Sequence, residues 1–563
     1  MKGFPKFRAV RAALLAAGVA GIAAVTIAQT GPAISSRPGE RTPRPLPPPA
    51  GAEGIRLSLD EAVALAIANN QDLNVSVNAA EASRYVLFAN MGIFDPLAEA
   101  AVLRSHSEQP ATSQLAGANV TQSDTTDISA RVTQLAPTGG RFSLGFAGRR
   151  TSTNSTFFFV NPSWSTGLTL SVSQPLLRNF GRDTTTWLIQ TARNSRDASY
   201  QGFVRSVQTA VNGVEQAYWD LVYAIRNLAV KQEALVVARD LNRITRIKID
   251  VGSLAPIDIT QTEVGIATAE QNIIIAESLI GDAQDRLKRL LSFNPEQWAV
   301  PIVPTDEVRA DLPAVKVDDG IRTALERRPE IIAAEYNVDS DRIRYDFWRN
   351  QTRPQLDLVG SYGFSGIGGT TTLRDSDGNV ISRMSGGFGD SFQQILDRDF
   401  KSWSIGLNFS YPILNRRARG ERGAALFTWE SSKALLNSLE QNVLLEVRAA
   451  ARDIDTARRT IAAAQKSREL AERNLDAERK KFDNGMTTSF QVTQIQNDLS
   501  AARSLELQAL AVYRKALSTY HYAIADILEW KNIRIEDLPA TEPPRPESRA
   551  PRVLAPSPPP AGQ

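Results

Sequence analysis

The chain contains one long unit twice, and this duplication restricts its fold more than any other feature of the sequence. Three segments of the first half have a similar partner in the second half, about 230 to 260 residues later. The pairs are LDEAVALAIANNQDL (59–73) with VDDGIRTALERRPEI (317–331), LSVSQPLL (170–177) with LNFSYPIL (407–414), and IDVGSLAPIDITQ (249–261) with FDNGMTTSFQVTQ (482–494). The pairs keep their order, so the sequence predicts one elongated domain made of two repeats, residues 55–300 and 301–538.

Each repeat contains a stretch in which apolar and small polar side chains alternate. Residues 402–411 alternate Trp, Ile, Leu, Phe and Tyr with Ser, Gly and Asn, and residues 167–173 alternate Leu and Val with Gly, Thr and Ser. This period of two predicts β-strands with one apolar and one polar face. A membrane strand beside a wet pore has this pattern, and so does an ordinary half-buried sheet.

Further strands are expected in both repeats. Residues 356–361 predict a partner strand in the second repeat, and the Gly-, Asp- and Ser-rich residues 363–401 predict a long polar loop after it. The first repeat has more strand-like sequence, at 96–104, 128–135 and 142–146. This material predicts an extra hairpin that the second repeat lacks.

Long stretches after the strands space their apolar residues alternately three and four apart. The rule holds over 204–228 and 259–290 in the first repeat, and over 443–475 and 510–527 in the second. A sustained period of 3.5 predicts long helices packed with a left-handed supercoil. Many of these positions are Ala, Thr or Val, which suits close packing in a curved wall of helices. A soluble coiled-coil scaffold is the alternative interpretation of the helices taken alone.

A short polar turn with a glycine joins the two helices of each predicted pair. The turns are residues 251–256 in the first repeat and 484–489 in the second. The glycine permits a left-handed backbone after the first helix, and Ser253 or Ser489 is expected to cap the returning one. Each repeat therefore predicts a helical hairpin with a similar tip.

The two ends of the chain differ from its middle. Basic residues followed by an uncharged run over 12–28 predict a secretory signal peptide, residues 1–28, with a retained signal anchor as the alternative. Residues 29–54 and 539–563 are Pro-rich and predict a linker and a disordered tail. A secreted chain without a second apolar stretch of membrane-spanning length is soluble, surface-attached or built into an outer membrane by strands.

Composition excludes much chemistry. The chain has no cysteine and two histidines, His106 and His521, so disulfides, thiol nucleophiles and Cys-based zinc sites are excluded. A net charge of +3 gives no reason to expect a nucleic-acid partner. Asp375, Asp377 and Asn379 resemble part of a calcium loop that lacks its final Glu, which favours a plain turn. With no nucleophile and base set, we expect no enzyme activity, no cofactor and no metal.

The duplicated entry helices, the strand ends SQPLL and SYPIL, and the tips VGSLAPIDITQTE and NGMTTSFQVTQIQ, in two ordered copies, resemble the outer-membrane efflux protein family of TolC-like channels. The resemblance extends from about residue 57 to 538. Many members carry a lipid on an N-terminal cysteine, which this chain lacks.

The resemblance implies an α+β membrane protein of two tandem repeats. Long coiled-coil helices would form a periplasmic α-barrel, and four transmembrane strands per protomer would form a 12-stranded β-barrel in a homotrimer. Physics agrees on the oligomer, because four strands cannot close a barrel alone. The implied function is the exit duct of a tripartite efflux pump or type I secretion system. Its implied partners are a periplasmic adaptor, an inner-membrane transporter and outer-membrane lipid.

The resemblance also implies sites at the helical tips. Asp258 falls on an acidic constriction position of the family, whereas Gln491 and Gln494 stand where the second repeat would carry acidic residues. The expected gate therefore has one charged ring, and an N-terminal helix residue stabilised by the helix dipole is the alternative reading of Asp258. The implied adaptor-docking residues are Val251, Gly252, Ser253, Leu254 and Pro256, and Asn484, Gly485, Met486 and Thr487.

Two other classes of protein remain open at this point. A secreted or periplasmic coiled-coil structural or adaptor protein without a pore would have the same helices. A secreted enzyme would need a role for His106 or His521.

Overall fold

The computed structural model describes residues 54–111, 117–155, 158–307, 316–374, 380–535 and 553–554. The expected signal peptide, nearly all of the two Pro-rich segments and the calcium-loop fragment at 375–379 lie outside these residues. The chain forms two compact units. The first comprises Met1–Ala82, Gln201–Glu330 and Glu440–Gln563, and the second comprises Ser83–Tyr200 and Ile331–Leu439. Each unit thus contains parts of both repeats.

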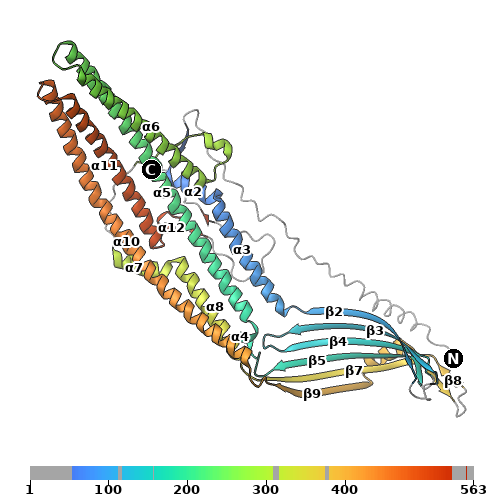
Figure 1. The fold of residues 1–563 in the computed structure, drawn as a ribbon. Helices are drawn as coiled ribbons and strands as arrows, with labels where there is room; N and C mark the ends of the chain where they lie inside the picture. Colours follow the sequence, from blue (N-terminus) through green and yellow to red (C-terminus); the bar gives the residue numbers. More distant parts are fainter. Residues whose placement is uncertain are drawn as a thin grey trace, which may run out of the picture. The chain divides into compact units, whose positions relative to one another are not determined.

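Long helices build the first unit (Figure 1). They are α2 (Leu59–Asn69), the start of α3 (Gln71–Met91), most of α5 (Trp187–Asp250), α6 (Ile257–Leu291), α7 (Val317–Arg327), the later part of α10 (Arg416–Asp483), α11 (Ser489–Ala523) and α12 (Ile527–Trp530). The 3₁₀ helix η4 (Pro295–Ala299) precedes a short parallel pair of β1 (Ile55–Leu57) with β6 (Ile302–Pro304). The strands β10 (Arg534–Ile535) and β11 (Val553–Leu554) pair antiparallel.

The core of the first unit follows the three-and-four spacing. Val207, Val211, Val214, Tyr218 and Leu221 of α5 are all at most 1% exposed. On α10 the residues at the predicted positions are also buried, namely Val443, Val447, Ala450, Ile454, Ala457, Ile461 and Ala464. Burial therefore falls on the stripe that the period of 3.5 marks, and the predicted long helices are confirmed at 64 residues for α5 and 68 for α10. None of the described helices is both long and apolar enough to cross a membrane.

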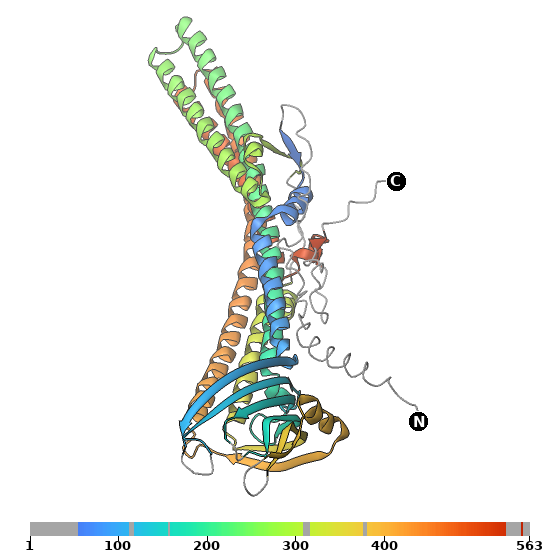
Figure 2. The ribbon, with the colours of Figure 1, turned by 90° about the vertical axis from the view of Figure 1, so that its right-hand side faces the viewer.

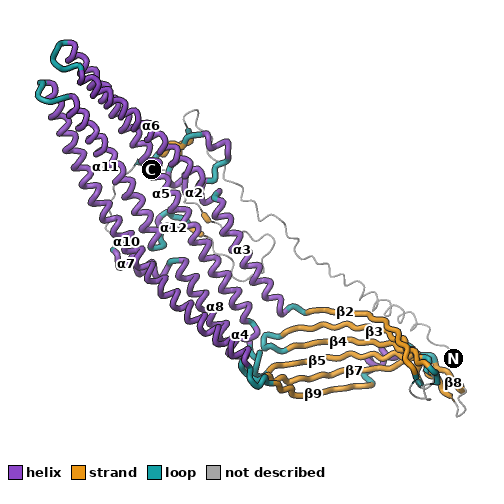
Figure 3. Tube along the Cα trace, in the orientation of Figure 1, coloured by secondary structure: helices purple, strands orange, loops and turns teal. Residues whose placement is uncertain are grey.

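A curved antiparallel sheet dominates the second unit (Figure 3). Its strands are β2 (Leu97–Pro110), β3 (Val120–Leu135), β4 (Arg141–Thr153), β5 (Val160–Pro175), β7 (Gln355–Arg374), β8 (Val380–Met384) and β9 (Phe400–Ser410). The order is β2-β3-β4-β5-β7, and both β9 and β8 pair with the far side of β7. The unit also holds η2 (Gly92–Phe94), α4 (Arg182–Thr185), α8 (Pro329–Gln351), α9 (Phe388–Asp397) and the adjoining ends of α3, α5 and α10.

The strand predictions are confirmed. The extra hairpin of the first repeat exists as β2 and β3, so the sheet contains six long strands, two more than the four transmembrane strands that the resemblance implied. The predicted strand at 128–135 covers only the second half of β3. The first half was not predicted, because it is polar on both faces and shows no apolar alternation.

The predicted loop over 363–401 is wrong. This segment contains the second half of β7, the strand β8 and the helix α9. The glycines of β7 made this part of the sequence resemble a loop. They are needed in the strand because α9 packs so close to its backbone that a side chain would not fit. A Cβ on Gly366 would lie 1.9 Å from the backbone oxygen of Ser391 in α9, and one on Gly368 would lie 2.4 Å from that of Gly387.

Candidate membrane surface and helical tips

One face of the sheet exposes large apolar side chains on every long strand. A single row of paired residues crosses the sheet from β2 to β9 on this face. The row is Ala98, Val132, Leu144, Leu170, Tyr362 and Trp403. Trp403, Ile405 and Phe409 of β9 are 72%, 71% and 68% exposed. So broad an apolar face on one chain marks a surface that meets lipid or another protein.

The opposite face is lined by small polar residues from β3 to β9. The neighbouring row on that face is Thr133, Ser143, Ser171, Ser361 and Ser404, and it ends on β2 at Leu97, which is exposed like Leu103 on the same face. The hydroxyls of Ser361 and Ser404 hydrogen-bond at 2.8 Å, and Arg149 pairs with Asp127 at 2.5 Å between β4 and β3. The sheet thus has one apolar face and one polar face, which we call the wet face. This is the pattern of a membrane barrel wall, whose outside meets lipid and whose inside meets water.

The sheet is open at both sides. Within the described residues, β2 pairs only with β3, and β9 pairs only with β7. Each edge therefore presents a row of backbone donors and acceptors that another strand can satisfy. In hydrocarbon such edges must be paired, because no water is present to bond them.

Helix α9 covers one interruption of the sheet. The pairing of β7 with β9 ends at Ser365, and its pairing with β8 begins at Thr371. Between them, the amide of Gln394 donates to the carbonyl of Ile367 at 3.0 Å and accepts from its N–H at 2.9 Å. The side-chain amide of Gln394 thus makes the two hydrogen bonds that the backbone of a neighbouring strand would make. The apolar face beneath α9 contributes Phe146 and Trp164, whose rings meet Phe388 edge-on.

The two helical hairpins of the first unit end in tips of the same design (Figures 1 and 2). Gly252 and Gly485 have φ of 76° and 73°, as the glycine rule predicts. In each tip the glycine N–H and the next N–H bond back to carbonyls of the last helical turn, at 2.8 Å for both bonds in the first tip and at 3.1 and 2.9 Å in the second. The repeats therefore share their turn chemistry as well as their sequence.

The cap prediction at these tips is wrong. Helix α11 begins after Thr488, whose hydroxyl accepts from the Gln491 N–H, and α6 begins after Pro256 without a side-chain cap. The Ser489 side chain is buried and donates to Asp258 Oδ1 at 2.8 Å and to Gln261 Oε1 at 3.3 Å. Ser489 thus connects the tip of the second repeat to the start of α6 in the first.

The other expected site residues lie around this bond. Asp258 is half-buried, while Gln491 and Gln494 are exposed on α11. Of the expected docking residues, Val251 and Met486 are 70% and 69% exposed. Gly252, Ser253, Pro256, Asn484 and Gly485 are also exposed.

Two of the expected docking residues face inward. Leu254 packs against a buried cluster of Leu241, Leu475, Phe482, Val492, Ile495 and Leu499. Thr487 donates to Glu478 at 2.6 Å. This bond and the ammonium of Lys481 lower the pKa of Glu478. Sequence reasoning overlooked Phe490, a 57% exposed ring in the first turn of α11, although an aromatic residue at the start of a helix beside a polar turn is a visible signal.

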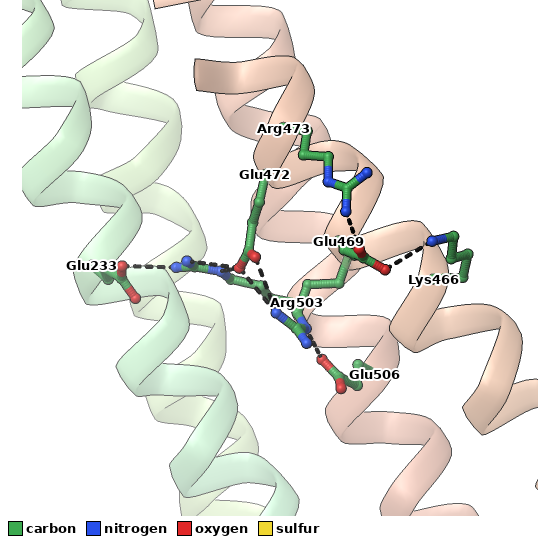
Figure 4. A network of polar contacts seen from close by, with 8 residues as sticks. Glu233, Lys466, Glu469, Glu472, Arg473, Arg503 and Glu506 are labelled. Atoms are coloured by element: carbon green, nitrogen blue, oxygen red, sulfur yellow. Dashed lines mark hydrogen bonds and ion pairs between the residues drawn. The ribbon is translucent and has the colours of Figure 1, made fainter. Parts of the chain in front are cut away.

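A network of charged residues joins α5, α10 and α11 away from the tips (Figure 4). Arg503 of α11 bonds Glu233 of α5 at 2.7 Å and Glu472 of α10 at 3.2 Å. Arg468 of α10 also bonds Glu472, at 3.1 Å, and reaches Glu506 at 2.5 Å. Partial burial would raise the pKa of Glu472, but the hydrogen bonds from Arg503 and Arg468 lower it overall. The network thus favours the ionised carboxylate.

The two histidines take part in packing and surface pairing. His521 stacks on Trp530 with ring centroids 4.3 Å apart, and its Nδ1 lies 2.8 Å from Asp526. His106 lies on β2 beside Asp124 and Glu108. Among the described residues, no group of His, Asp or Glu is placed to hold a metal ion.

Comparisons with known proteins agree with this geometry. The chain matches the model of the family described as outer membrane efflux protein over residues 141–292 and 320–519, more than half of its length. It belongs to the outer membrane efflux protein family. The members are channel proteins and not enzymes, so the chain is an outer-membrane channel protein whose helices extend into the periplasm.

Relatives in sequence are distant. Nodulation protein T of Rhizobium leguminosarum bv. trifolii is 22% identical over 348 residues, which cover 60% of this chain and 67% of that protein. Fusaric acid resistance protein FusA of Burkholderia cepacia is 26% identical over 204 residues, covering 36% of this chain and 34% of that protein.

Solved structures show the fold more completely. The outer-membrane channel OprN aligns with a TM-score of 0.61 at 15% identity, over 83% of this chain and 90% of that one. CusC aligns with a TM-score of 0.59 at 16% identity, over 87% and 97%. The predicted fold class of long helices and strands in a TolC-like channel is confirmed.

Proposed function

We propose that three copies of the chain form a passive exit duct, which a periplasmic adaptor connects to an inner-membrane transporter. The observation that carries the proposal is the sheet, which has one apolar face, one wet face and two open edges. One copy cannot cover this face or pair these edges. Copies that pair edge to edge would close a barrel with lipid outside and water inside.

The helices also support assembly. Helix α6 exposes Ile257, Val264, Ile274, Ile275 and Leu279, each at least 44% exposed. A soluble single chain would not keep these side chains in water, so this surface of α6 suits a second copy. Transport of a toxic compound is suggested by the name of one relative, the fusaric acid resistance protein, and an efflux pump is therefore the favoured setting over type I secretion.

Asp258 is the proposed constriction residue, and its bond to Ser489 is proposed to hold the two tips of one copy together. Three carboxylates around a threefold axis would repel one another and attract cations. Gln491 and Gln494 would add polar but uncharged groups to the same opening. The exposed tip residues, Val251, Met486 and Phe490 above all, are the proposed contact with the adaptor.

Conductance in planar bilayers tests the duct, together with native mass measurement of the detergent-extracted protein. We expect a trimer with stable ion-conducting openings. A water-soluble monomer without conductance would contradict the proposal and favour a coiled-coil structural or adaptor protein.

Three variants separate the charge of the gate from its bond. Asp258→Asn removes the charge but keeps an acceptor for Ser489, so cation preference should fall while conductance stays close to the original. Ser489→Ala removes the bond but keeps the charge, so conductance should rise with cation preference intact. Asp258→Ala should show both effects. Identical channels in all three variants would refute the role of Asp258 and leave the duct standing.

A further inference from the structure

The number of long strands in the sheet determines how wide a barrel three copies of the chain would form. The six long strands β2, β3, β4, β5, β7 and β9 have 14, 16, 13, 16, 20 and 11 residues. A tilted strand needs about 9–11 residues to cross a bilayer, so each of the six is long enough. The family match begins at Arg141, the first residue of β4, and therefore leaves out β2 and β3.

The hairpin of β2 and β3 continues the apolar face of the other strands. Ala98, Ala100 and Val102 of β2 stand opposite Val132, Ala130 and Ile128 of β3. The same three rows continue through Leu144, Phe146 and Gly148 of β4. Beyond Val102, this face of β2 carries Arg104, His106 and Glu108, which ends the apolar band. The hairpin therefore has an apolar surface at the same level as the apolar residues of β4, of which Phe146 packs against α9.

Strand β3 of the hairpin also continues the wet face, whereas the same face of β2 carries the exposed Leu97 and Leu103. Thr133 of β3 lies in the row of Ser143, Ser171, Ser361 and Ser404. The ion pair of Asp127 with Arg149 links β3 to β4 on this same side. Charged pairs suit a water-filled lumen and not hydrocarbon. If the hairpin were folded into the lumen as a plug, water would surround it. An apolar band aligned with that of the wall would then not be expected.

We propose that each copy contributes six strands to the membrane wall, so that the trimeric pore has eighteen strands. This proposal rests on the trimeric duct proposed above. The β2 edge of one copy would pair with the β9 edge of the next, and the β2–β3 hairpin would be part of the wall.

The expected gain in width follows from barrel geometry. With strands about 4.7 Å apart and tilted by about 40°, twelve strands give a barrel about 24 Å across between backbones, and eighteen give about 35 Å. Inward-pointing side chains narrow the opening of both barrels, but the backbone diameter with eighteen strands is still about 1.5 times that with twelve. The pore would admit solutes too wide for a twelve-stranded channel, and the periplasmic tips would then be the narrowest part of the route.

Spin-label distances across the trimer measure this width without depending on the gate. The chain has no cysteine, so Thr133→Cys on β3 and Ser404→Cys on β9 each introduce a unique labelling site. Both residues lie on the wet face, and threefold symmetry places the three copies of each label on a circle whose radius is set by the barrel. Three labels on an eighteen-stranded barrel should be about 30 Å apart, against about 20 Å for twelve strands.

The outcomes distinguish the two proposals. About 30 Å at both sites in a membrane-embedded trimer would support the eighteen-stranded wall. About 20 Å at Ser404, with a different distance at Thr133, would show the hairpin outside the wall and overturn this inference while the duct stands. A protein that forms no membrane trimer would overturn both.

Discussion

Phe482 and Phe490 are two phenylalanines of one helical tip with opposite surroundings. Phe482, near the end of α10, is 2% exposed and packs in the cluster with Leu475 and Val492. The ammonium of Lys248 lies 4.2 Å from the centroid of its ring. Phe490, in the first turn of α11, is 57% exposed. The pair allows the same substitution to be made inside and outside the packed tip.

Phe482→Ala should weaken the packing between the two hairpins. Truncating a buried Phe costs about 3–5 kcal/mol, and losing the cation contact adds about 0.5–1 kcal/mol. The combined loss of about 4 kcal/mol corresponds to a change of about a thousandfold in the local opening equilibrium. Phe490→Ala removes an exposed ring and should change stability by less than about 0.5 kcal/mol.

Hydrogen exchange of the detergent trimer measures this opening at the level of peptides. Under conditions where exchange follows the opening equilibrium, Phe482→Ala should accelerate exchange in segments 240–262 and 478–495 by about a thousandfold. Phe490→Ala should leave exchange unchanged and weaken binding of an adaptor hairpin. Equal exchange in both variants would refute the claim that this cluster holds the two tips together.

Two further predictions concern the helices and the sheet. Arg503→Met should lower stability by about 1 kcal/mol, because its pairs with Glu233 and Glu472 are partly exposed. Since the folded pKa of Glu472 is lowered, this contribution exists above about pH 4.5 and is lost as pH falls through the folded pKa. The difference in apparent unfolding temperature from the parent should therefore shrink at low pH, and a constant difference would contradict the network. Gly366→Ala should detach α9 and open the 388–397 segment to proteolysis, while Gly360→Ala, whose Cβ meets its nearest atom at 3.8 Å, should not; equal cleavage of both would count against close packing of α9.

The repeats, the helix pairs and their tips could be predicted from the sequence because each leaves a local periodic signal. The spacing of Val207, Val211 and Val214 marks a buried stripe whatever lies against it, since side chains three and four residues apart share one helix face. Gly252 and Gly485 mark the tips because only glycine adopts a left-handed backbone at little cost.

Contacts between distant parts of the chain had no such signal. The bond from Ser489 to Asp258 joins residues of different repeats, and nothing local distinguishes Ser489 from a helix cap. Gly366 and Gly368 looked like loop residues because their purpose is the approach of α9, which only the tertiary structure reveals.

The sequence by itself therefore determined the duplicated architecture, the helical hairpins and the alternation of the strands. The tertiary structure decided the order in which the strands pair, which edges stay open and which tip residues face one another. The physical reason is that periodicity reports the faces of an element, whereas strand pairing and close packing depend on partners far away in the chain.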